Sequence, residues 1–343
     1  MQKTLALVDD PLFCEHRAPA GHPERPERLH AARAAIAHAD LDLRRVDLAT
    51  RSATPDELVR VHTEAYLELL GQAAGRSGYF DEDTFYSASS VDAARAGAGA
   101  ALVITDALLD RHADFGLALV RPPGHHARPS GAMGFCLLNN VAIAAAHARA
   151  RGVERVAIVD FDVHHGNGTQ EAFYSDPSVL YVSLHQSPLY PGTGAARENG
   201  AGDGRGYTVN VPLSAGAGDA AYAAALERIV APVLESYRPD LLLFSAGFDA
   251  HVRDPLAQMQ MTDLGFRALI RRTLAALRPG VGVGLMLEGG YDLSGLGSSL
   301  AAALEGLGEG PNAAPSPAGP LWDAHEADLA AAAAVAAELW KLS

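Results

Sequence analysis

Short apolar runs alternate with helical patterns along most of this 343-residue chain. The runs are expected to be strands, and they lie at residues 4–8, 116–120, 156–159, 179–184, 207–211, 241–244 and 281–287. Helices are expected between them, at residues 26–39, 55–70, 91–110, 138–151, 219–237 and 262–277. Strands that are apolar throughout are buried on both faces, and strand–helix alternation pairs them in parallel. The sequence therefore predicts an α/β fold in which helices flank both faces of a mostly parallel central sheet.

No convincing domain boundary interrupts this pattern, so one domain is expected over residues 1–343. Near the end of the chain, residues 307–320 are rich in Gly and Pro and are expected to form a surface connection. An Ala-rich helix over residues 322–342 is expected to pack back onto the domain. Pro212 is expected to end the strand at 207–211, because proline cannot donate a hydrogen bond to a neighbouring strand.

Composition excludes several classes of protein. The formal net charge of −14 argues against a nucleic-acid groove, which needs a basic surface. Cys14 and Cys136 are the two cysteines, and they form no C-x-x-C pair, which excludes a disulfide scaffold and a thiol-based zinc ribbon. The N-terminal apolar run is too short for a signal peptide, and no run of about 18 apolar residues could span a membrane. A cytoplasmic protein is therefore expected, and the Ala-, Gly- and Arg-rich composition is typical of bacteria with GC-rich DNA.

Four of the expected strands end in polar residues that can do chemistry. His125 and His126 follow the strand at 116–120, and the stretch I-V-D-F-D-V-H-H-G-N-G-T-Q begins inside the strand at 156–159. Asp249 and Tyr291 follow the strands at 241–244 and 281–287. In open α/β sheets, ligands bind outside the carboxyl ends of the strands. These side chains are therefore expected to converge on one edge of the sheet.

The first chemistry indicated is metal binding. Asp162, His164 and Asp249 offer two carboxylates and one imidazole, and three such ligands with a fourth position open are typical of a catalytic zinc site. A D-x-H pair alone is more often a capped loop with a buried, hydrogen-bonded histidine. A second strand that ends in Gly-Phe-Asp favours the metal interpretation. A two-manganese site would need further carboxylates in place of Gly166 and His251, so one metal ion is favoured.

The adjacent histidines suit acid–base catalysis. His125 and His126 follow Pro-Pro-Gly, so a tight turn can direct both imidazoles into one cavity. Asp160 and Asn167 are the right kinds of partner: a carboxylate would hold one imidazole charged, and an amide would leave the other free to exchange protons. Tyr291 could donate a hydrogen bond to a developing oxyanion, although a lone tyrosine is more often a packing residue. The chain contains neither a G-x-S-x-G elbow nor a phosphate-binding loop.

The motifs R-P-P-G-H-H, D-F-D-V-H-H-G-N-G-T-Q, S-A-G-F-D-A-H and L-E-G-G-Y resemble those of the histone deacetylase and acetylpolyamine amidohydrolase family, in a class II-like form. The resemblance runs from about His22 to Gly306. It implies an arginase/deacetylase-type fold, with Asp162, His164 and Asp249 as ligands of one zinc ion per chain. It also implies that His125 pairs with Asp160, that His126 lies near Asn167, and that Tyr291 polarises the substrate carbonyl.

Further roles are implied only by the resemblance. They include one or two structural potassium ions, an acyl-lysine channel and a product-exit cavity. For a first potassium site the resemblance implies Asp160, Asp162, His164, Ser183 and Leu184, and for a second site it implies Phe173, Asp176, Val179 and Tyr207. It implies that Gly134, Phe135, Tyr190 and Leu256 line the channel. It also implies that Arg28 lines the exit cavity. Tyr190 departs from the usual Phe, which leaves the preferred acyl chain open. Leu256 replaces the acidic residue of polyamine-selective relatives and so disfavours polyamine as the main substrate.

The sequence thus predicts a zinc-dependent amidohydrolase that hydrolyses the amide of acylated, most simply acetylated, lysine-type amines and releases acetate and the free amine. One alternative is a deacetylase of acetylpolyamines or other small amides. A distant alternative is a non-catalytic module that binds acyl-lysine. The expected partner is an acyl-lysine peptide, a protein or a small acylated amine, with no nucleic acid and no membrane. The oligomeric state stays open, a homo-oligomer included, and His165 is expected to support its loop rather than to bind metal.

Overall fold

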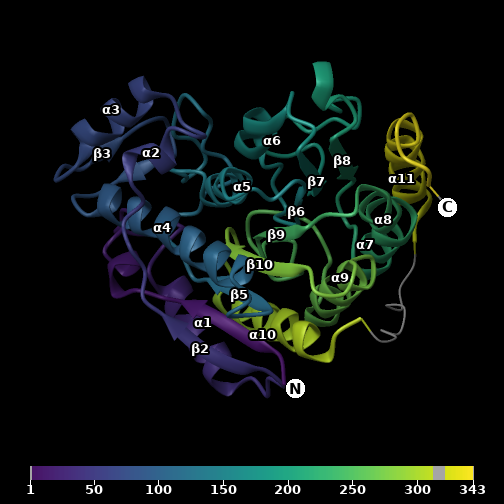
Figure 1. Ribbon diagram of the computed structural model, residues 1–343, viewed down its shortest axis with the longest axis horizontal. Helices are drawn as coiled ribbons and strands as arrows, with labels where there is room; N and C mark the ends of the chain where they lie inside the picture. Colours follow the sequence, from purple (N-terminus) through teal and green to yellow (C-terminus); the bar gives the residue numbers. More distant parts are fainter. Residues whose placement is uncertain (1, 312–320, 343) are drawn as a thin grey trace.

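The computed structural model describes residues 2–311 and 321–342 and is built around one eight-stranded sheet (Figure 1). The strand order is β2-β1-β5-β10-β9-β6-β7-β8, and every neighbouring pair is parallel. The strands are β1 (Thr4–Val8), β2 (Arg44–Leu48), β5 (Phe115–Ala118), β6 (Val156–Asp160), β7 (Val179–Gln186), β8 (Thr208–Leu213), β9 (Leu241–Ala246) and β10 (Gly282–Leu287). The predicted parallel α/β sheet is confirmed.

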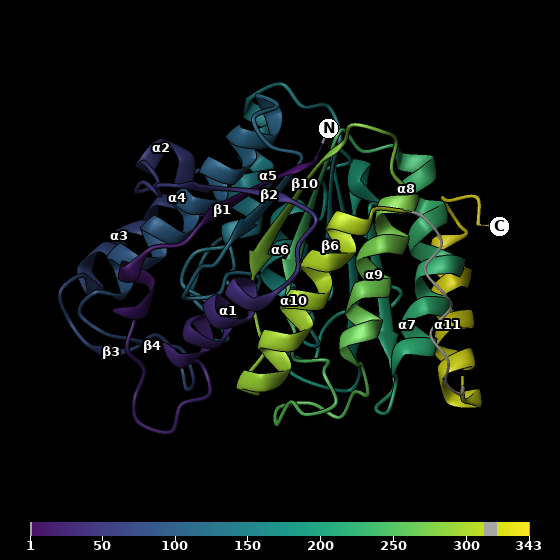
Figure 2. The same cartoon turned by 90° about the horizontal axis from the view of Figure 1, so that it is seen from below.

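Helices cover both faces of this sheet. The α-helices are α1 (Glu27–His38), α2 (Pro55–Leu58), α3 (Glu64–Ala73), α4 (Ser90–Leu109), α5 (Asn140–Ala150), α6 (Asn167–Phe173), α7 (Asp219–Ala225), α8 (Ala231–Tyr237), α9 (Asp263–Ala275), α10 (Leu293–Glu309) and α11 (Asp323–Ala336). Helices α4 and α5 pack on one face, and α1, α10 and α9 lie side by side on the other (Figure 2). Within the described residues, none of the helices is both long enough and apolar enough to cross a membrane.

The core explains why the strands are apolar throughout. Strands β1, β5, β6, β7 and β9 are buried at every residue, because each has a strand on both sides and helices above and below. The edge strand β2 differs, since Arg44, Arg45 and Asp47 make it polar and mostly exposed. Charged side chains on an edge strand discourage pairing with another chain. Because of these charged residues, β2 is not an apolar run, and the sequence analysis did not predict it.

Several sequence-based boundaries were wrong. The helix predicted over 55–70 is two helices, α2 and α3, because Thr63 caps a new helix by accepting a hydrogen bond from the backbone N–H of Tyr66. The strand predicted to end at Pro212 continues to Leu213; β8 lies at the sheet edge, where a missing donor is tolerated. The helix over 219–237 is interrupted by the π-helical turn η3 (Leu226–Val230).

The C-terminal part also differs from the prediction. Helix α10 extends to Glu309, so the first residues of the connection predicted over 307–320 are helical, and residues 312–320 lie outside the described part. The terminal helix α11 is shorter than the predicted 322–342 and packs against β8 and α7. Trp340 adds a hydrogen bond from its indole nitrogen to the carbonyl of Gly206, at 2.8 Å. Two short 3₁₀ turns, η1 (Pro11–Cys14) and η2 (Gly202–Gly204), and a small antiparallel hairpin of β3 (Gly78–Tyr79) and β4 (Phe85–Tyr86) complete the fold.

Candidate metal centre and active site

Four adjacent strands carry the polar residues singled out in the sequence. Strands β5, β10, β9 and β6 are neighbours in the sheet, and the loops after them hold His125, Tyr291, Asp249 and Asp162 respectively. The carboxyl ends of parallel strands lie at the same edge of a sheet. These four side chains therefore meet at one place, although they are far apart in the chain.

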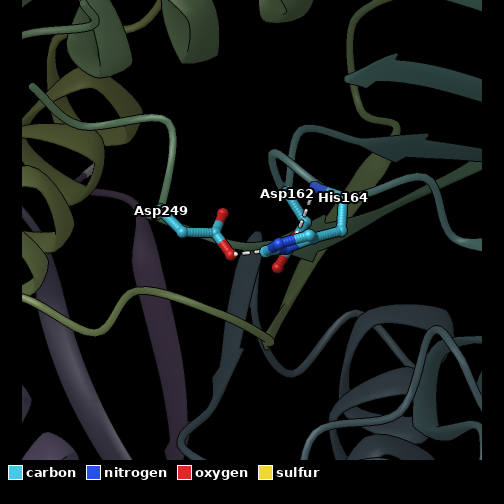
Figure 3. Close-up of side chains that lie close together, drawn as sticks. All are labelled: Asp162, His164 and Asp249. Atoms are coloured by element: carbon cyan, nitrogen blue, oxygen red, sulfur yellow. Dashed lines mark hydrogen bonds and ion pairs between the residues drawn. The ribbon is translucent and has the colours of Figure 1, made fainter. Parts of the chain in front are cut away.

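Asp162, His164 and Asp249 form a compact buried cluster (Figure 3). His164 Nδ1 lies 3.1 Å from Asp162 Oδ1 and 3.2 Å from Asp249 Oδ2. Their ligand atoms all lie within 4.8 Å of one another, and within the described residues this is the one cluster of three or more such side chains. The structure thus brings together the three side chains predicted to bind zinc.

The donor set fits a divalent cation. Burial and the neighbouring charge of Asp162 raise the pKa of Asp249 to about 7, because two buried carboxylates repel each other. Although burial opposes it, these two carboxylates raise the pKa of His164 to about 10, so the cluster favours positive charge. Any side chain at Gly247 or Gly289 would collide with the carboxylate oxygens. The glycines keep open the space that a metal ion needs.

His125 is paired with a carboxylate. Its Nδ1 lies 3.0 Å from Asp160 Oδ2, which also accepts a hydrogen bond from the Tyr181 hydroxyl at 3.1 Å. Burial opposes the charged form, but Asp162 and Asp160 raise the pKa of His125 to about 10. The imidazole is therefore held as an imidazolium at neutral pH.

His126 is paired with an amide. Its Nδ1 lies 2.8 Å from Asn167 Oδ1, and an amide oxygen only accepts, so Nδ1 carries the proton and Nε2 keeps a lone pair. Burial, followed by the charges of His125 and His164, lowers the pKa of His126 well below its usual value. The two imidazole rings lie 4.0 Å apart between centroids, so one charged and one neutral histidine stand side by side.

Tyr291 lies in the loop after β10, next to Gly290, whose φ of +114° would strain any side chain. The backbone N–H of Tyr291 donates to Asp254 Oδ2 at 2.6 Å, which fixes the turn. The phenol ring packs under the guanidinium of Arg28, whose central carbon lies 5.0 Å from the ring centroid. The predicted exit-cavity residue thus contacts the predicted carbonyl-polarising residue.

Two buried glutamates that support this site were missed by the sequence reasoning. Glu288 accepts hydrogen bonds from the backbone N–H groups of Gly124, at 2.6 Å, and His125, at 3.1 Å. Glu24 bridges two fully buried arginines, Arg28 and Arg121. Glu288 lies within the motif L-E-G-G-Y, so its place beside Tyr291 was a signal in the sequence, whereas Glu24, in the stretch H-P-E-R-P, had no comparable signal.

A cavity of about 250 Å³ leads to His126, His164 and Tyr291. The four residues predicted to bind substrate, Gly134, Phe135, Tyr190 and Leu256, all line it, together with Leu189 and Asp83. We call this cavity the channel. Asp83 was missed because it comes from the loop between β3 and β4, about 40 residues before the histidine pair in sequence but beside it in space.

The remaining predicted positions have mixed support. Ser183 on β7 pairs in register with Asp160 on β6, and Leu184 follows it, so this potassium site has the predicted neighbours and stays a prediction. The second potassium site, near the start of β7, also stays a prediction. His165 hydrogen-bonds to Thr193 Oγ1 at 2.7 Å and to Gln170 Oε1 at 3.0 Å, which agrees with a supporting role in its loop.

Comparison with known proteins identifies relatives over most of the chain. A family model described as "Histone deacetylase domain" matches residues 22–307. A "Probable deacetylase" of Archaeoglobus fulgidus is 39% identical over 287 residues, which cover 82% of this chain and 80% of that protein. "Polyamine deacetylase HDAC10" of Homo sapiens is 40% identical over 358 residues, which cover 99% of this chain and 52% of that protein. The chain therefore spans about half the length of the human relative.

The fold has a solved counterpart. The crystal structure of the HDA15 HD domain superimposes with a TM-score of 0.90 at 37% sequence identity, and the alignment covers 99% of this chain and 96% of that one. The predicted arginase/deacetylase-type architecture is therefore confirmed.

Proposed function

The chain belongs to the histone deacetylase family, and we propose that it is a zinc-dependent amidohydrolase that removes acetyl groups from lysine-type amines. The similarity to deacetylases supports the general activity. One observation carries the finer proposal: two adjacent histidines with different partners, Asp160 and Asn167, lie beside a buried Asp–His–Asp cluster. This arrangement offers a charged donor, a neutral base and a cation site within one small volume.

Asp162, His164 and Asp249 would hold the zinc ion. Two carboxylates and one imidazole around an open space suit a catalytic rather than a structural zinc. When bound, the ion would polarise the amide carbonyl and lower the pKa of the attacking water. Gly289 also donates its backbone N–H to Asp162 Oδ2 at 2.8 Å, so the ligand is held in place from β10.

His126 is assigned the proton transfers. Its Nε2 lone pair is left free by the hydrogen bond between Nδ1 and Asn167, and the side chain lines the channel. A neutral imidazole there can take a proton from the attacking water and later give it to the leaving amine. The amine needs that proton, because an unprotonated amine would have to leave as a nitrogen anion, which is too poor a leaving group.

His125 and Tyr291 are assigned the stabilisation of negative charge. Burial opposes the charged form of His125, but the charges of Asp162 and Asp160 raise its pKa, so an imidazolium can favour the charge that develops as water attacks the carbonyl. Tyr291 lines the channel beside His126 and His164, and its hydroxyl can donate to the same oxygen. Burial raises the pKa of Tyr291, so the phenol keeps its proton throughout.

A second candidate function is the hydrolysis of acetylpolyamines, and one observation favours it. Asp83 places a carboxylate in the channel beside Leu256, the position that is acidic in polyamine-selective relatives. A carboxylate there could attract the second amine of a polyamine. The similarity to a polyamine deacetylase of Homo sapiens is compatible with this substrate.

The test is metal-dependent release of acetate. We expect the purified protein to hydrolyse acetyl-lysine amide, to lose activity after treatment with a chelator and to recover it when zinc is added. Turnover that survives complete metal removal would contradict the proposed mechanism. If acetyl-lysine binds but no acyl amide is hydrolysed with any metal, the chain is a binding module instead.

A further inference from the structure

The channel wall at Leu256 and the proposed oxyanion donor Tyr291 come from two loops that are joined by one side chain. Asp254 lies two residues before Leu256 in the loop after β9, and Tyr291 lies in the loop after β10. Asp254 Oδ1 accepts a hydrogen bond from the backbone N–H of Leu256 at 3.0 Å. Its Oδ2 accepts from the backbone N–H groups of Tyr291, at 2.6 Å, and Asp292, at 3.2 Å. Each oxygen of this carboxylate therefore holds one of the two loops.

The Asp254 carboxylate is a firm joint. The residue is only 7% exposed, and hydrogen bonds to a charged acceptor away from water are stronger than those between neutral groups. Its own loop is also fixed, because the backbone N–H of Asp254 donates to the carbonyl of His251 at 2.8 Å. His251 in turn accepts through Nδ1 from the backbone N–H of Arg253 at 3.2 Å. A shift of either loop is therefore passed to the other through Asp254.

Tyr291 depends on its backbone for its position. Two glycines precede it, and glycine leaves the backbone free to move unless other groups hold it. Arg28 holds one side of this turn, through the carbonyl of Gly290 at 2.7 Å, and Asp254 holds the N–H of Tyr291 itself. The Tyr291 side chain has ring contacts with Arg28 and Phe135, but within the described residues its hydroxyl makes no hydrogen bond. The place of the hydroxyl is therefore set by the turn.

We propose that Asp254 is a positioning residue for Tyr291, and that it makes the place of the Tyr291 hydroxyl depend on how the channel is filled against Leu256. A substrate that packs on Leu256 holds that loop still, and the shared carboxylate then holds Tyr291 still as well. Binding energy from the substrate chain is in this way used in the transition state and appears in kcat. The proposal rests on the proposed function, since it assumes that Tyr291 acts on the substrate carbonyl.

A double-mutant cycle tests the positioning of Tyr291. Asparagine has the size of aspartate, but its single oxygen can accept from only one of the two loops, so Asp254→Asn cuts the link. We expect this variant to lower kcat for an acetyl-lysine capped at both ends roughly tenfold, while KM changes less than about twofold. Tyr291→Phe already lacks the hydroxyl, so adding Asp254→Asn to it should cause no further loss. A further tenfold loss in the double variant would show that Asp254 acts on the fold at large and would overturn the proposal.

A second cycle tests the link to Leu256. Leu256→Ala removes the side chain that lines the channel but keeps the backbone N–H that binds Asp254. We expect it to lower kcat roughly threefold when Asp254 is present and to leave kcat unchanged when Asp254→Asn has already cut the link. An equal loss of kcat in both backgrounds would overturn the dependence of Tyr291 on Leu256.

Asp219→Asn is the matched control. Both oxygens of Asp219 also accept hydrogen bonds, from the backbone N–H of Thr262 at 2.8 Å and from its hydroxyl at 2.7 Å, but Asp219 does not line the channel. Its kcat should stay normal. If Asp254→Asn does not fold, as judged by circular dichroism, Asp254→Ser goes through the same cycles, because its one hydroxyl also reaches only one loop. No hydrolysis by the wild type would overturn the proposed function itself, whereas additive losses with an active wild type would overturn only the role of Asp254.

Discussion

Thr84→Val should displace one wall of the channel. Phe135 has a φ of +67°, in the left-handed region where a bulky side chain is strained by roughly 1–2 kcal/mol. Its backbone N–H donates to Thr84 Oγ1 at 3.3 Å, and Thr84 is fully buried. The same hydroxyl donates to Asp83 Oδ1 at 3.1 Å. One buried side chain therefore holds both a strained channel wall and a carboxylate that lines the channel.

The magnitude follows from what valine removes. Valine keeps the shape of threonine but leaves the N–H of Phe135, which is part-buried, without its partner; the cost lies toward the lower end of the roughly 1–3 kcal/mol of a fully buried group. Without this hydrogen bond, the strained backbone conformation of Phe135 is no longer stabilised. The turn is therefore expected to relax to an unstrained φ and to move the Phe135 side chain out of the channel. We expect KM for a capped acetyl-lysine to rise roughly tenfold in Thr84→Val, a change of about 1.4 kcal/mol, while kcat changes much less.

Thr84→Ser distinguishes the effect of the hydroxyl from the effect of the packed methyl group. Serine keeps the hydroxyl and loses one buried methyl group, worth roughly 0.8 kcal/mol of stability. It should therefore unfold at lower urea concentration than the wild type but keep a nearly normal KM. Steady-state kinetics and urea unfolding of both variants are the required measurements. A normal KM in Thr84→Val, or an equal rise of KM in Thr84→Ser, would refute the role given to the hydroxyl.

Two further substitutions test the catalytic groups. Tyr291→Phe should lower kcat by roughly a hundredfold or more, because loss of one oxyanion donor costs on the order of 2.7–4 kcal/mol. The zinc content, measured by elemental analysis, should stay normal. Full activity in this variant would exclude the role of Tyr291 as a donor to the oxyanion. Asn167→Asp should move the acidic limb of the kcat/KM–pH profile to higher pH, because a carboxylate raises the pKa of His126, which acts as a base only above that pKa. An unshifted limb would show that Asn167 does not set the protonation of His126.

The metal and histidine residues could be predicted from sequence because their signals are local. Each motif directly follows an apolar strand, and parallel strands bring their ends together whatever the details of packing. Thr84 and Asp83 had no such signal. They lie in a hairpin loop, and their relation to Phe135 depends on how that hairpin docks against a turn some 50 residues later.

Helix α10 shows a different limit of sequence reasoning. Its glycines are unfavourable in isolated helices, so the stretch has no clear helical signal. In the structure they are contact points between helices: a side chain at Gly306 would press on the backbone carbonyl of Arg267 in α9, and one at Gly297 would approach Ala31 in α1. Close packing of α10 against α9 and α1 therefore favours glycine where helix propensity disfavours it.

The position of β10 has a consequence for how this protein is made. β10 is the last strand of the chain, yet it lies in the middle of the sheet between β5 and β9 (Figure 1). A nascent chain that has not yet produced it can pair β2-β1-β5 and β9-β6-β7-β8 only as two separate halves. The Asp162–His164–Asp249 cluster belongs to one half and His125 to the other, while Glu288 and Tyr291 arrive with β10 itself. Metal ligands can thus gather during synthesis, but the complete catalytic group exists only once the final strand has closed the gap.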